Sequence, residues 1–538
     1  MLTVREGEAG SLTVGATSPD GSALSYRWLR NGIDYPSAGN AATITWSPSP
    51  FQLSYTPRTW QVEVRNAGGA VLSSETTVNH VNREWLDIGT AHPEQAHASL
   101  DSPGQLVSVT GPDGRVHIAS THSGHEPSPG NSITFKGHSK DSDGDSWAYA
   151  SAIPAASPGA RISHISLATS WMGEIVATWL ETGGAGEDAP RIVRAALYRP
   201  GPSNAVAGSW TLIGTVSDTA LQAAEPTVVA QGGGNYGIAW LQGSPGAPRD
   251  AVLRRYQVPE AGAALASGLL DPVPVAMEAL AGSISRLQVL QGGNGFMAFM
   301  LVEGGAGAPA RWHYSIGAHT LSWSTPADLG LATEAERIHW AEPVNGLTAL
   351  AATDGANRVY TRRLDFTRPG VFQSDWAYTA NAHGSAPVLL IDGEGRIDVF
   401  GVSVALDSTH HSVLGHWTYN PGTGAWGSAT LLAQSATDFR LGLGLRSPVA
   451  GRDAQGNFVL AWLEKPSASV PQSLKAMRYS RFSAGWTSAL DVAAPPAGVA
   501  GQVAPTLQVY TESGRATIAW GERSASEDAD RVKHARLR

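Results

Sequence analysis

The chain has 538 residues, of which 42% are hydrophobic and only 15% are charged, well below the roughly 25% of charged residues in an ordinary soluble domain. The net charge is −9 and cysteine is absent, which excludes disulfides, zinc–thiolate sites and thiol nucleophiles. No basic run could neutralise a phosphate backbone, so nucleic acid is not an expected partner. Low charge with 61 glycines and 18 tryptophans favours an all-β fold in more than one domain or in a repeat array.

The first residues, MLTVREGEAG, have no basic segment followed by an apolar run, so they do not form a signal peptide. They begin almost within a strand pattern, and we therefore expect a chain trimmed at its start. An extracellular or cell-surface protein without disulfides fits this composition, although a cytoplasmic one fits the lack of cysteine as well. The longest apolar run, FMAFMLV, is too short to cross a bilayer, so membrane insertion is not expected.

Residues 1–80 hold alternating runs separated by turns: SLTVGATS, LSYRWLRNG, ATITW, TWQVEVRNAGG and AVLSSETTV. Such alternation predicts about five antiparallel strands with one buried face, as in a small β-sandwich. The segment resembles an immunoglobulin-like module, because Trp28 stands at the place of its core tryptophan, and Val14 and Val62 at the places of its two cysteines. The resemblance implies an Ig-like β-sandwich that serves as a spacer or an adhesion unit.

A nine-residue phrase recurs along the rest of the chain, as in GEIVATWLE, GNFVLAWLE and GRATIAWGE. Successive copies start 49–61 residues apart, a period typical of repeat architectures. The eight copies begin at Gly114, Gly173, Gly234, Gly295, Gly346, Gly395, Gly456 and Gly514.

Each copy contains the same series of segments: a short strand, a tight turn, the phrase as a second strand, a loop, a third strand and a fourth strand headed by tryptophan in several copies. Four antiparallel strands per copy, repeated radially, form a β-propeller blade. The last copy ends after its third strand, whereas REWLDIGTA around Trp85 is a fourth strand without the first three. We therefore expect a closed eight-bladed β-propeller over residues 83–538, with this N-terminal strand closing the last blade; an open solenoid is the alternative.

The tryptophans of the phrase are expected to pack between blades rather than to bind ligand. They are Trp179, Trp240, Trp462 and Trp520.

The residue eight positions after each anchoring glycine is polar in every copy. Strand geometry places it at the same end of each second strand, beside long variable loops around the mouth of the central channel, where binding residues commonly lie. The alternative is a solvated strand end whose charge is paired by a basic residue of the third strand, the candidates being Arg194, Arg254, Lys475 and Lys533. The positions are His122, Glu181, Gln242, Glu303, Asp354, Ser403, Glu464 and Glu522, and all except Ser403 are predicted to bind ligand.

The loop HSKDSDGDSW carries three carboxylates at alternate positions, Asp141, Asp143 and Asp145. Oxygen ligands at this spacing suit Ca²⁺, which is the one cofactor we consider, and a plain solvated turn is the alternative. The loop resembles the Asp-box turn of sialidase-like propellers with one residue inserted, through Ser139, Asp141, Gly144 and Trp147. The six blades and the arginine triad of that superfamily have no counterpart here, so sialidase activity is not carried over.

No catalytic motif stands out in the sequence. The first hypothesis is therefore a non-catalytic extracellular binding or adhesion protein that recognises carbohydrate or another surface polymer. The alternative is a polysaccharide-degrading lyase or glycoside hydrolase that uses His122, His125 and Glu126 of THSGHEP as acid and base, near His410 and His411 of another loop. A third hypothesis is a structural part of a larger surface protein.

Overall fold

The computed structural model describes an all-β molecule in which the only helices among the described residues are two short 3₁₀ turns, η1 (Pro36–Ala38) and η2 (Leu265–Gly268). None of the described helical segments has the length and hydrophobicity needed to span a bilayer. The description covers the chain except residues 1, 6–8, 47–56, 82, 91–105, 112–114, 124–130, 139–148, 157–159, 184–188, 202–207, 246, 261–262, 276–281, 293–294, 305–308, 319–322, 332–336, 355–357, 368–371, 384, 405–410, 439–442, 471, 482, 494–498, 510–514, 525–529 and 538.

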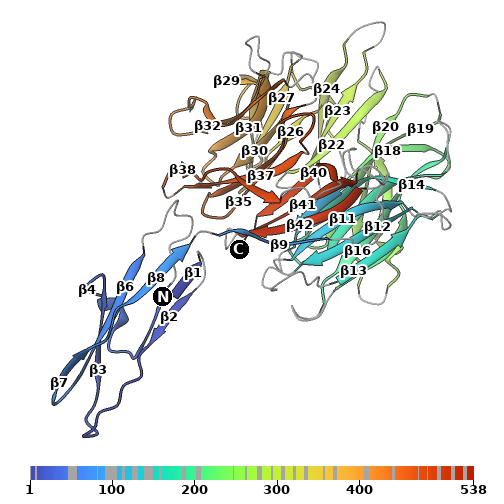
Figure 1. The fold of residues 1–538 in the computed structure, drawn as a ribbon. Coiled ribbons are helices and arrows are strands. Elements are labelled where there is room, and N and C mark those ends of the chain that lie inside the picture. Colours follow the sequence, from blue (N-terminus) through green and yellow to red (C-terminus); the bar gives the residue numbers. More distant parts are fainter. Residues whose placement is uncertain are drawn as a thin grey trace.

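The N-terminal strands form two small sheets that share one core (Figure 1). Trp28, Trp60 and Val62 of one sheet are buried against Ile44 and Trp46 of the other. This segment has more strands than the five or so expected, because its alternating runs are broken into short pieces. One sheet has the order β1-β8-β6-β3-β4 with β7 on β6, and the other pairs β2 with β5. The strands are β1 (Leu2–Arg5), β2 (Gly10–Thr13), β3 (Ser25–Arg30), β4 (Ile33–Asp34), β5 (Thr43–Trp46), β6 (Arg58–Asn66), β7 (Gly69–Leu72) and β8 (Thr76–Val81).

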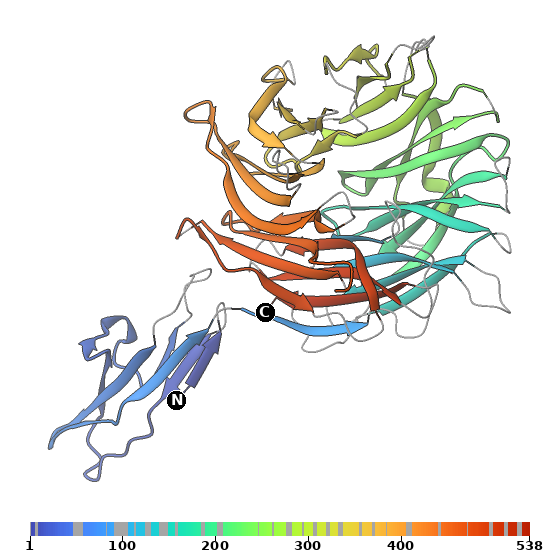
Figure 2. The same cartoon turned by 45° about the horizontal axis from the view of Figure 1, so that its top comes forward.

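The rest of the chain forms eight successive antiparallel sheets (Figure 2). Within each sheet the strands pair in chain order, as the repeat predicts. The first four sheets are β10 (Leu106–Thr110), β11 (Val116–Ser123), β12 (Asn131–His138) and β13 (Tyr149–Pro154); β14 (Arg161–Thr169), β15 (Ile175–Thr182), β16 (Arg191–Arg199) and β17 (Ser209–Thr215); β18 (Gln222–Gly232), β19 (Asn235–Gly243), β20 (Asp250–Gln257) and β21 (Leu269–Pro274); β22 (Ile284–Gly292), β23 (Gly295–Val302), β24 (Arg311–Ala318) and β25 (Ala327–Asp328).

In the sixth and seventh sheets, the fourth strand is divided into two pieces that both pair with the third strand. The fifth to seventh sheets are β26 (His339–Trp340), β27 (Leu347–Thr353), β28 (Arg358–Asp365) and β29 (Ala377–His383); β30 (Ser385–Ile391), β31 (Ile397–Val404), β32 (His411–Asn420), β33 (Ala425–Trp426) and β34 (Thr430–Asp438); β35 (Gly444–Arg452), β36 (Phe458–Lys465), β37 (Ser473–Ser480), β38 (Gly485–Trp486) and β39 (Leu490–Ala493).

The last sheet contains a strand from the start of the repeat region. The sequence predicts this, because the last copy lacks a fourth strand and the segment around Trp85 is a fourth strand without the first three. Its strands are β40 (Val499–Val509), β41 (Ala516–Ser524), β42 (Asp530–Leu537) and β9 (Trp85–Thr90). β9 pairs antiparallel with β42 in a register that sets Trp85 opposite Leu537. Without β9, the outer edge of β42 would present unpaired backbone groups.

The first strands of consecutive sheets lie beside one another, and the last of them returns to the first. Ser108 Oγ on β10 lies 2.6 Å from Thr506 Oγ1 on β40, and Thr110 Oγ1 donates to Gln508 Oε1 of the same strand at 3.0 Å. Residues almost 400 positions apart in sequence therefore join the first and last sheets. This all-β arrangement of mostly four-stranded sheets is propeller-like.

The phrase tryptophans lie between sheets, which confirms the prediction that they are core residues. Trp179, Trp240, Trp462 and Trp520 are all almost fully buried, and Trp179, for example, packs with Phe135 of the preceding sheet. Five of the anchoring glycines, Gly173, Gly234, Gly346, Gly395 and Gly456, lie in or at the end of the turn before the second strand. Gly173 and Gly456 have φ of 94° and 81°, a left-handed conformation that glycine adopts without steric cost.

Candidate functional site

The positions eight residues after the glycines lie where the second strands end and the first strands begin, as expected. Glu181 is paired with Ile162 near the start of β14, and Glu464 with Leu445 near the start of β35. We call this edge of the sheets the mouth.

Three carboxylates at the mouth make ion pairs with the third strand of their own sheet. The side chain of Glu181 is only 2% exposed; it accepts a hydrogen bond from Arg194 Nη1 at 3.2 Å and another from the Ala156 amide at 2.7 Å. In the same way, Lys475 Nζ lies 3.4 Å from Glu464, and Lys533 Nζ lies 3.9 Å from Glu522. These contacts favour the structural alternative for the three glutamates.

The remaining members of this series have varied surroundings. Gln242 accepts a hydrogen bond from Trp240 Nε1 at 3.0 Å, and Asp354 binds Arg358 Nε at 2.6 Å. Glu303 is exposed and Ser403 is half-buried. The prediction that Arg254 pairs a carboxylate at the mouth is wrong, because its guanidinium donates to the Val216 and Leu270 carbonyls instead.

Several predicted site residues lie outside the described part of the chain. His122 is placed on β11 opposite Ser132, but its side chain is not described. His410 is likewise outside the description, whereas His411 begins β32. Within the described residues no group of three or more metal-binding side chains occurs, so the calcium prediction rests on sequence alone. The other undescribed candidates are His125, Glu126, Asp141, Asp143 and Asp145.

The first strands carry β-bulges close to the mouth, a feature that the sequence analysis did not predict. A bulge adds residues to one strand of a pair and redirects their side chains. His164 and Glu225 lie in two of these bulges with φ of 54° and 49°, and such strained backbone is common at functional sites. The register shifts lie between Ser163 and Ser166, Ala224 and Thr227, Ile284 and Arg286, Ser385 and Val388, Arg446 and Val449, and Val503 and Thr506.

Four residues of consecutive sheets, three of them in or beside these bulges, lie close enough for their charges to interact. We call them the arginine cluster: His164 of β14, Glu225 of β18, Arg286 of β22 and Arg337, two residues before β26. Arg286 Nη1 lies 2.8 Å from Glu225 Oε1, with the two side chains 42% and 16% exposed, respectively. His164 Nδ1 lies 3.0 Å from Ser163 Oγ. The Glu225 carboxylate is therefore paired with the Arg286 guanidinium group, near an imidazole and a second arginine whose charges act on each other.

The imidazole of His164 lies close enough to the other three groups to be affected by their charges. Burial lowers its pKa; Glu225 opposes this effect, and the positive charges of Arg337 and Arg286 add to it. A His whose pKa falls below its usual value of about 6.5 is neutral at pH 7 and can accept a proton.

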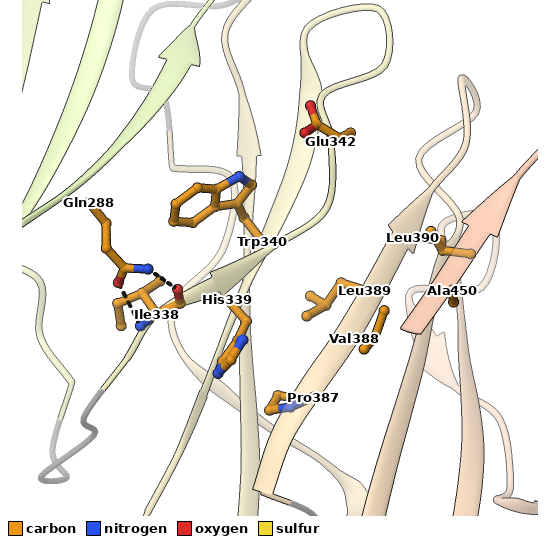
Figure 3. A pocket seen from close by; sticks show the side chains of 10 residues that line it. All are labelled: Gln288, Ile338, His339, Trp340, Glu342, Pro387, Val388, Leu389, Leu390 and Ala450. Carbon is orange, nitrogen blue, oxygen red and sulfur yellow. Dashed lines mark hydrogen bonds between the residues drawn. The ribbon is translucent and has the colours of Figure 1, made fainter. Parts of the chain in front are cut away.

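A cavity of about 400 Å³ adjoins the arginine cluster between the first strands of the fourth to seventh sheets. Figure 3 shows Gln288 on one side, the segment from Ile338 to Glu342 in the middle, and Pro387–Leu390 with Ala450 on the other side. Gln288 bonds both the amide and the carbonyl of Ile338, at 3.0 and 2.9 Å, which ties the fourth sheet to the fifth. We call this space the central cavity; its size lies in the usual range for small-molecule sites.

Two titratable side chains of the central cavity have shifted pKa values. Burial and the nearby Arg337 charge lower the pKa of His339 to about 4. Burial raises the pKa of Glu342 above its ordinary value. The cavity therefore combines apolar walls, the indole of Trp340 and a few polar groups, as ligand sites commonly do.

The four residues of the arginine cluster occupy equivalent positions of the sequence repeat. His164, Glu225, Arg286 and Arg337 each stand nine residues before an anchoring glycine, namely Gly173, Gly234, Gly295 and Gly346. The members of this second series differ in residue type, so the polar pattern that marks the positions after each glycine does not mark them.

Comparisons with known proteins give no family for the chain. No family model matches the sequence, and no curated protein matches it. Solved structures with similar folds include a fungal alcohol oxidase of the AA5 family in complex with copper (12% identity, TM-score 0.40, 85% of this chain and 93% of the other). They also include a PL25 ulvan lyase (12%, 0.39, 74% and 98%) and the Hadza microbial sialidase Hz136 (9%, 0.35, 98% and 92%).

Proposed function

We propose that residues 83–538 form a closed eight-bladed β-propeller and that residues 1–80 form an Ig-like β-sandwich in front of it. The pairing of β9 with β42 and the hydrogen bonds between β10 and β40 support the ring. The parallel pairing of β1 with β8 and the shared core around Trp28 support the sandwich. We also propose an extracellular or cell-surface location.

We propose that the protein recognises a carbohydrate polymer at the mouth of the propeller. The observation that carries this proposal is the arginine cluster. His164, Glu225 and Arg286 of three neighbouring first strands lie near Arg337, just before a fourth, beside the central cavity. Charged groups that form hydrogen bonds next to a half-buried indole suit a sugar, which offers hydroxyl groups at its rim and C–H groups on its faces.

The proposal is tested by retention on immobilised polysaccharides, including dextran, xylan, polygalacturonate and dextran sulfate. At least one should retain the protein. Ala450→Trp adds a large side chain to the wall of the central cavity and should weaken that retention. Leu490→Trp, on an exposed position of β39, is the matched control and should leave retention unchanged. Lack of retention on every polysaccharide, or equal retention of both variants, would contradict the proposal.

A second candidate function is cleavage of the bound polysaccharide. The neutral imidazole of His164 beside Glu225 favours it, since this arrangement suits a general base. Incubation with each retained polysaccharide should then release new reducing or unsaturated ends. His164→Gln should abolish their release while the protein is still retained. If no new ends appear with any retained polysaccharide, the protein only binds.

A further inference from the structure

The arginine cluster carries an excess of positive charge at the mouth. Arg286 and Arg337 each contribute one positive charge, Glu225 contributes one negative charge, and the lowered pKa of His164 leaves the imidazole neutral at pH 7. Within the described part of the chain, no carboxylate pairs with Arg337. The surplus is therefore one guanidinium group with no charge partner of its own among the described residues.

The ion pair within the cluster leaves room for an additional anion. Arg286 uses Nη1 toward Glu225, and a guanidinium group has five N–H donors in a planar fork. Its side chain is 42% exposed, so the remaining donors are within reach of a ligand. Glu225 is much less exposed, and its carboxylate competes with an added anion for this guanidinium group.

We propose that the ligand is an anionic glycan whose acidic group, a carboxylate or a sulfate ester, binds between Arg286 and Arg337. This inference rests on the proposed recognition of carbohydrate at the mouth and names the chemical class of the sugar. Planar carboxylates and sulfate oxygens match the guanidinium fork, and these charge-assisted hydrogen bonds are stronger than neutral ones. The central cavity, which begins at Ile338 beside Arg337, then receives a neighbouring sugar ring.

Affinity electrophoresis of the full chain through gels that contain dextran, dextran sulfate or polygalacturonate tests the inference. We expect retardation by one or both anionic polymers and none by dextran. Polygalacturonate and dextran sulfate separate the carboxylate from the sulfate as the acidic group. Retardation should decrease when salt rises, because exposed charge pairs are screened.

Variants then locate the acidic group. Arg286→Gln and Arg337→Gln should each weaken binding of the anionic polymer by roughly ten-fold or more. Arg311→Gln is the matched control, since this arginine pairs with Asp328 on the outer strands of the fourth sheet and is 62% exposed; it removes the same charge and should change binding less than about two-fold. Arg286→Lys keeps the positive charge but loses the planar guanidinium group. Its affinity for the anionic polymer should lie between those of wild type and Arg286→Gln.

Glu225→Gln separates anion binding from a purely structural role of the ion pair. If Glu225 only holds the fold, its loss should weaken binding. If an anion occupies the cluster, removal of the competing carboxylate should strengthen binding of the anionic polymer. Weaker binding by this variant, although circular dichroism shows it to be folded, would overturn the inference.

Two further outcomes distinguish this inference from the proposed function. Equal retardation by dextran and by the anionic polymers, unaffected by Arg286→Gln and Arg337→Gln, would overturn the inference and leave carbohydrate recognition standing. Failure of every polysaccharide to bind would overturn both.

Discussion

At the scale of single residues, two members of the arginine cluster have a left-handed backbone conformation that glycine would adopt more easily. His164, Glu225 and Ser447 all have positive φ in equivalent bulges. A left-handed conformation costs a residue with a Cβ atom roughly 1–2 kcal/mol. We infer that the functional side chains at the first two positions are kept at the expense of stability.

Two substitutions at His164 measure this cost. Ala and Gly both remove the imidazole, but only Gly relieves the strain, so His164→Gly should be more stable than His164→Ala by about 1 kcal/mol in urea unfolding. Ser447→Gly should also exceed Ser447→Ala in stability while it retains binding, because Ser447 lies outside the cluster. Equal stability of the Gly and Ala variants would show that the bulge is not strained.

The carboxylates at the mouth should differ widely in their effect on stability. Glu181→Gln leaves Arg194 buried without its ion partner, which costs about 3–5 kcal/mol. The equivalent change at the exposed Glu303 should stay within about 0.5 kcal/mol. Chemical denaturation of both variants checks this, and similar losses for the two would contradict the structural assignment of Glu181.

The buried imidazole of His117 should make the free energy of unfolding depend on pH. Its imidazole lies 1% exposed against Tyr198, and burial together with the Arg115 charge lowers its pKa to about 3. Because the unfolded chain binds this proton near pH 6.5, the free energy of unfolding should fall as pH drops from about 6.5 towards 3, by at most ~1.4 kcal/mol per pH unit for this group. Other buried histidines add to the slope, so the measurement is a comparison with His117→Gln, whose slope should be smaller. Identical slopes would show that His117 does not titrate between the two states.

At the scale of strands, closure of the ring depends on β9. Trp85 packs in the core between the last two sheets, and β9 completes the last one. Removal of residues 1–95 should expose the edge of β42 and cause aggregation or a large loss of thermal stability, whereas removal of residues 1–80 should leave the ring folded. Thermal melting and size-exclusion chromatography distinguish these outcomes. A stable, monomeric fragment of residues 96–538 would contradict the closed ring.

The strand pattern itself was largely predictable. Three features can be recognised locally in the sequence: the strand alternation of period two, the glycines with positive φ and the buried tryptophans of the phrase. Because the repeat contains them several times, the prediction did not depend on a single copy. The bulges were not predictable, because one or two extra residues in a first strand leave no mark of their own. They nevertheless carry His164 and Glu225, and Glu225 pairs with Arg286.

At the scale of the whole molecule, the proposed site is assembled from residues of four consecutive sheets, spaced across more than 170 residues of sequence from His164 to Arg337. Prediction from the sequence chose the same edge of the sheets that we propose, but it chose the ends of the second strands, where the polar pattern was regular. That regularity has a structural cause in Glu181, Glu464 and Glu522, which are paired within their own sheets. The positions of the arginine cluster, by contrast, hold a different residue type in each sheet. We infer that these differences allow the protein to select one ligand over another.

The most direct test of glycan recognition at the mouth is hydrogen–deuterium exchange with and without oligogalacturonate. We expect protection in peptides that cover residues 161–167, 222–230, 284–290 and 337–342, which carry the arginine cluster and part of the wall of the central cavity. Peptides from the outer strands β17, β21 and β25 and from the N-terminal strands β1–β8 should be unchanged. Protection confined to the N-terminal strands or to the hairpins at the opposite edge of the sheets, with none in the four first strands, would contradict it.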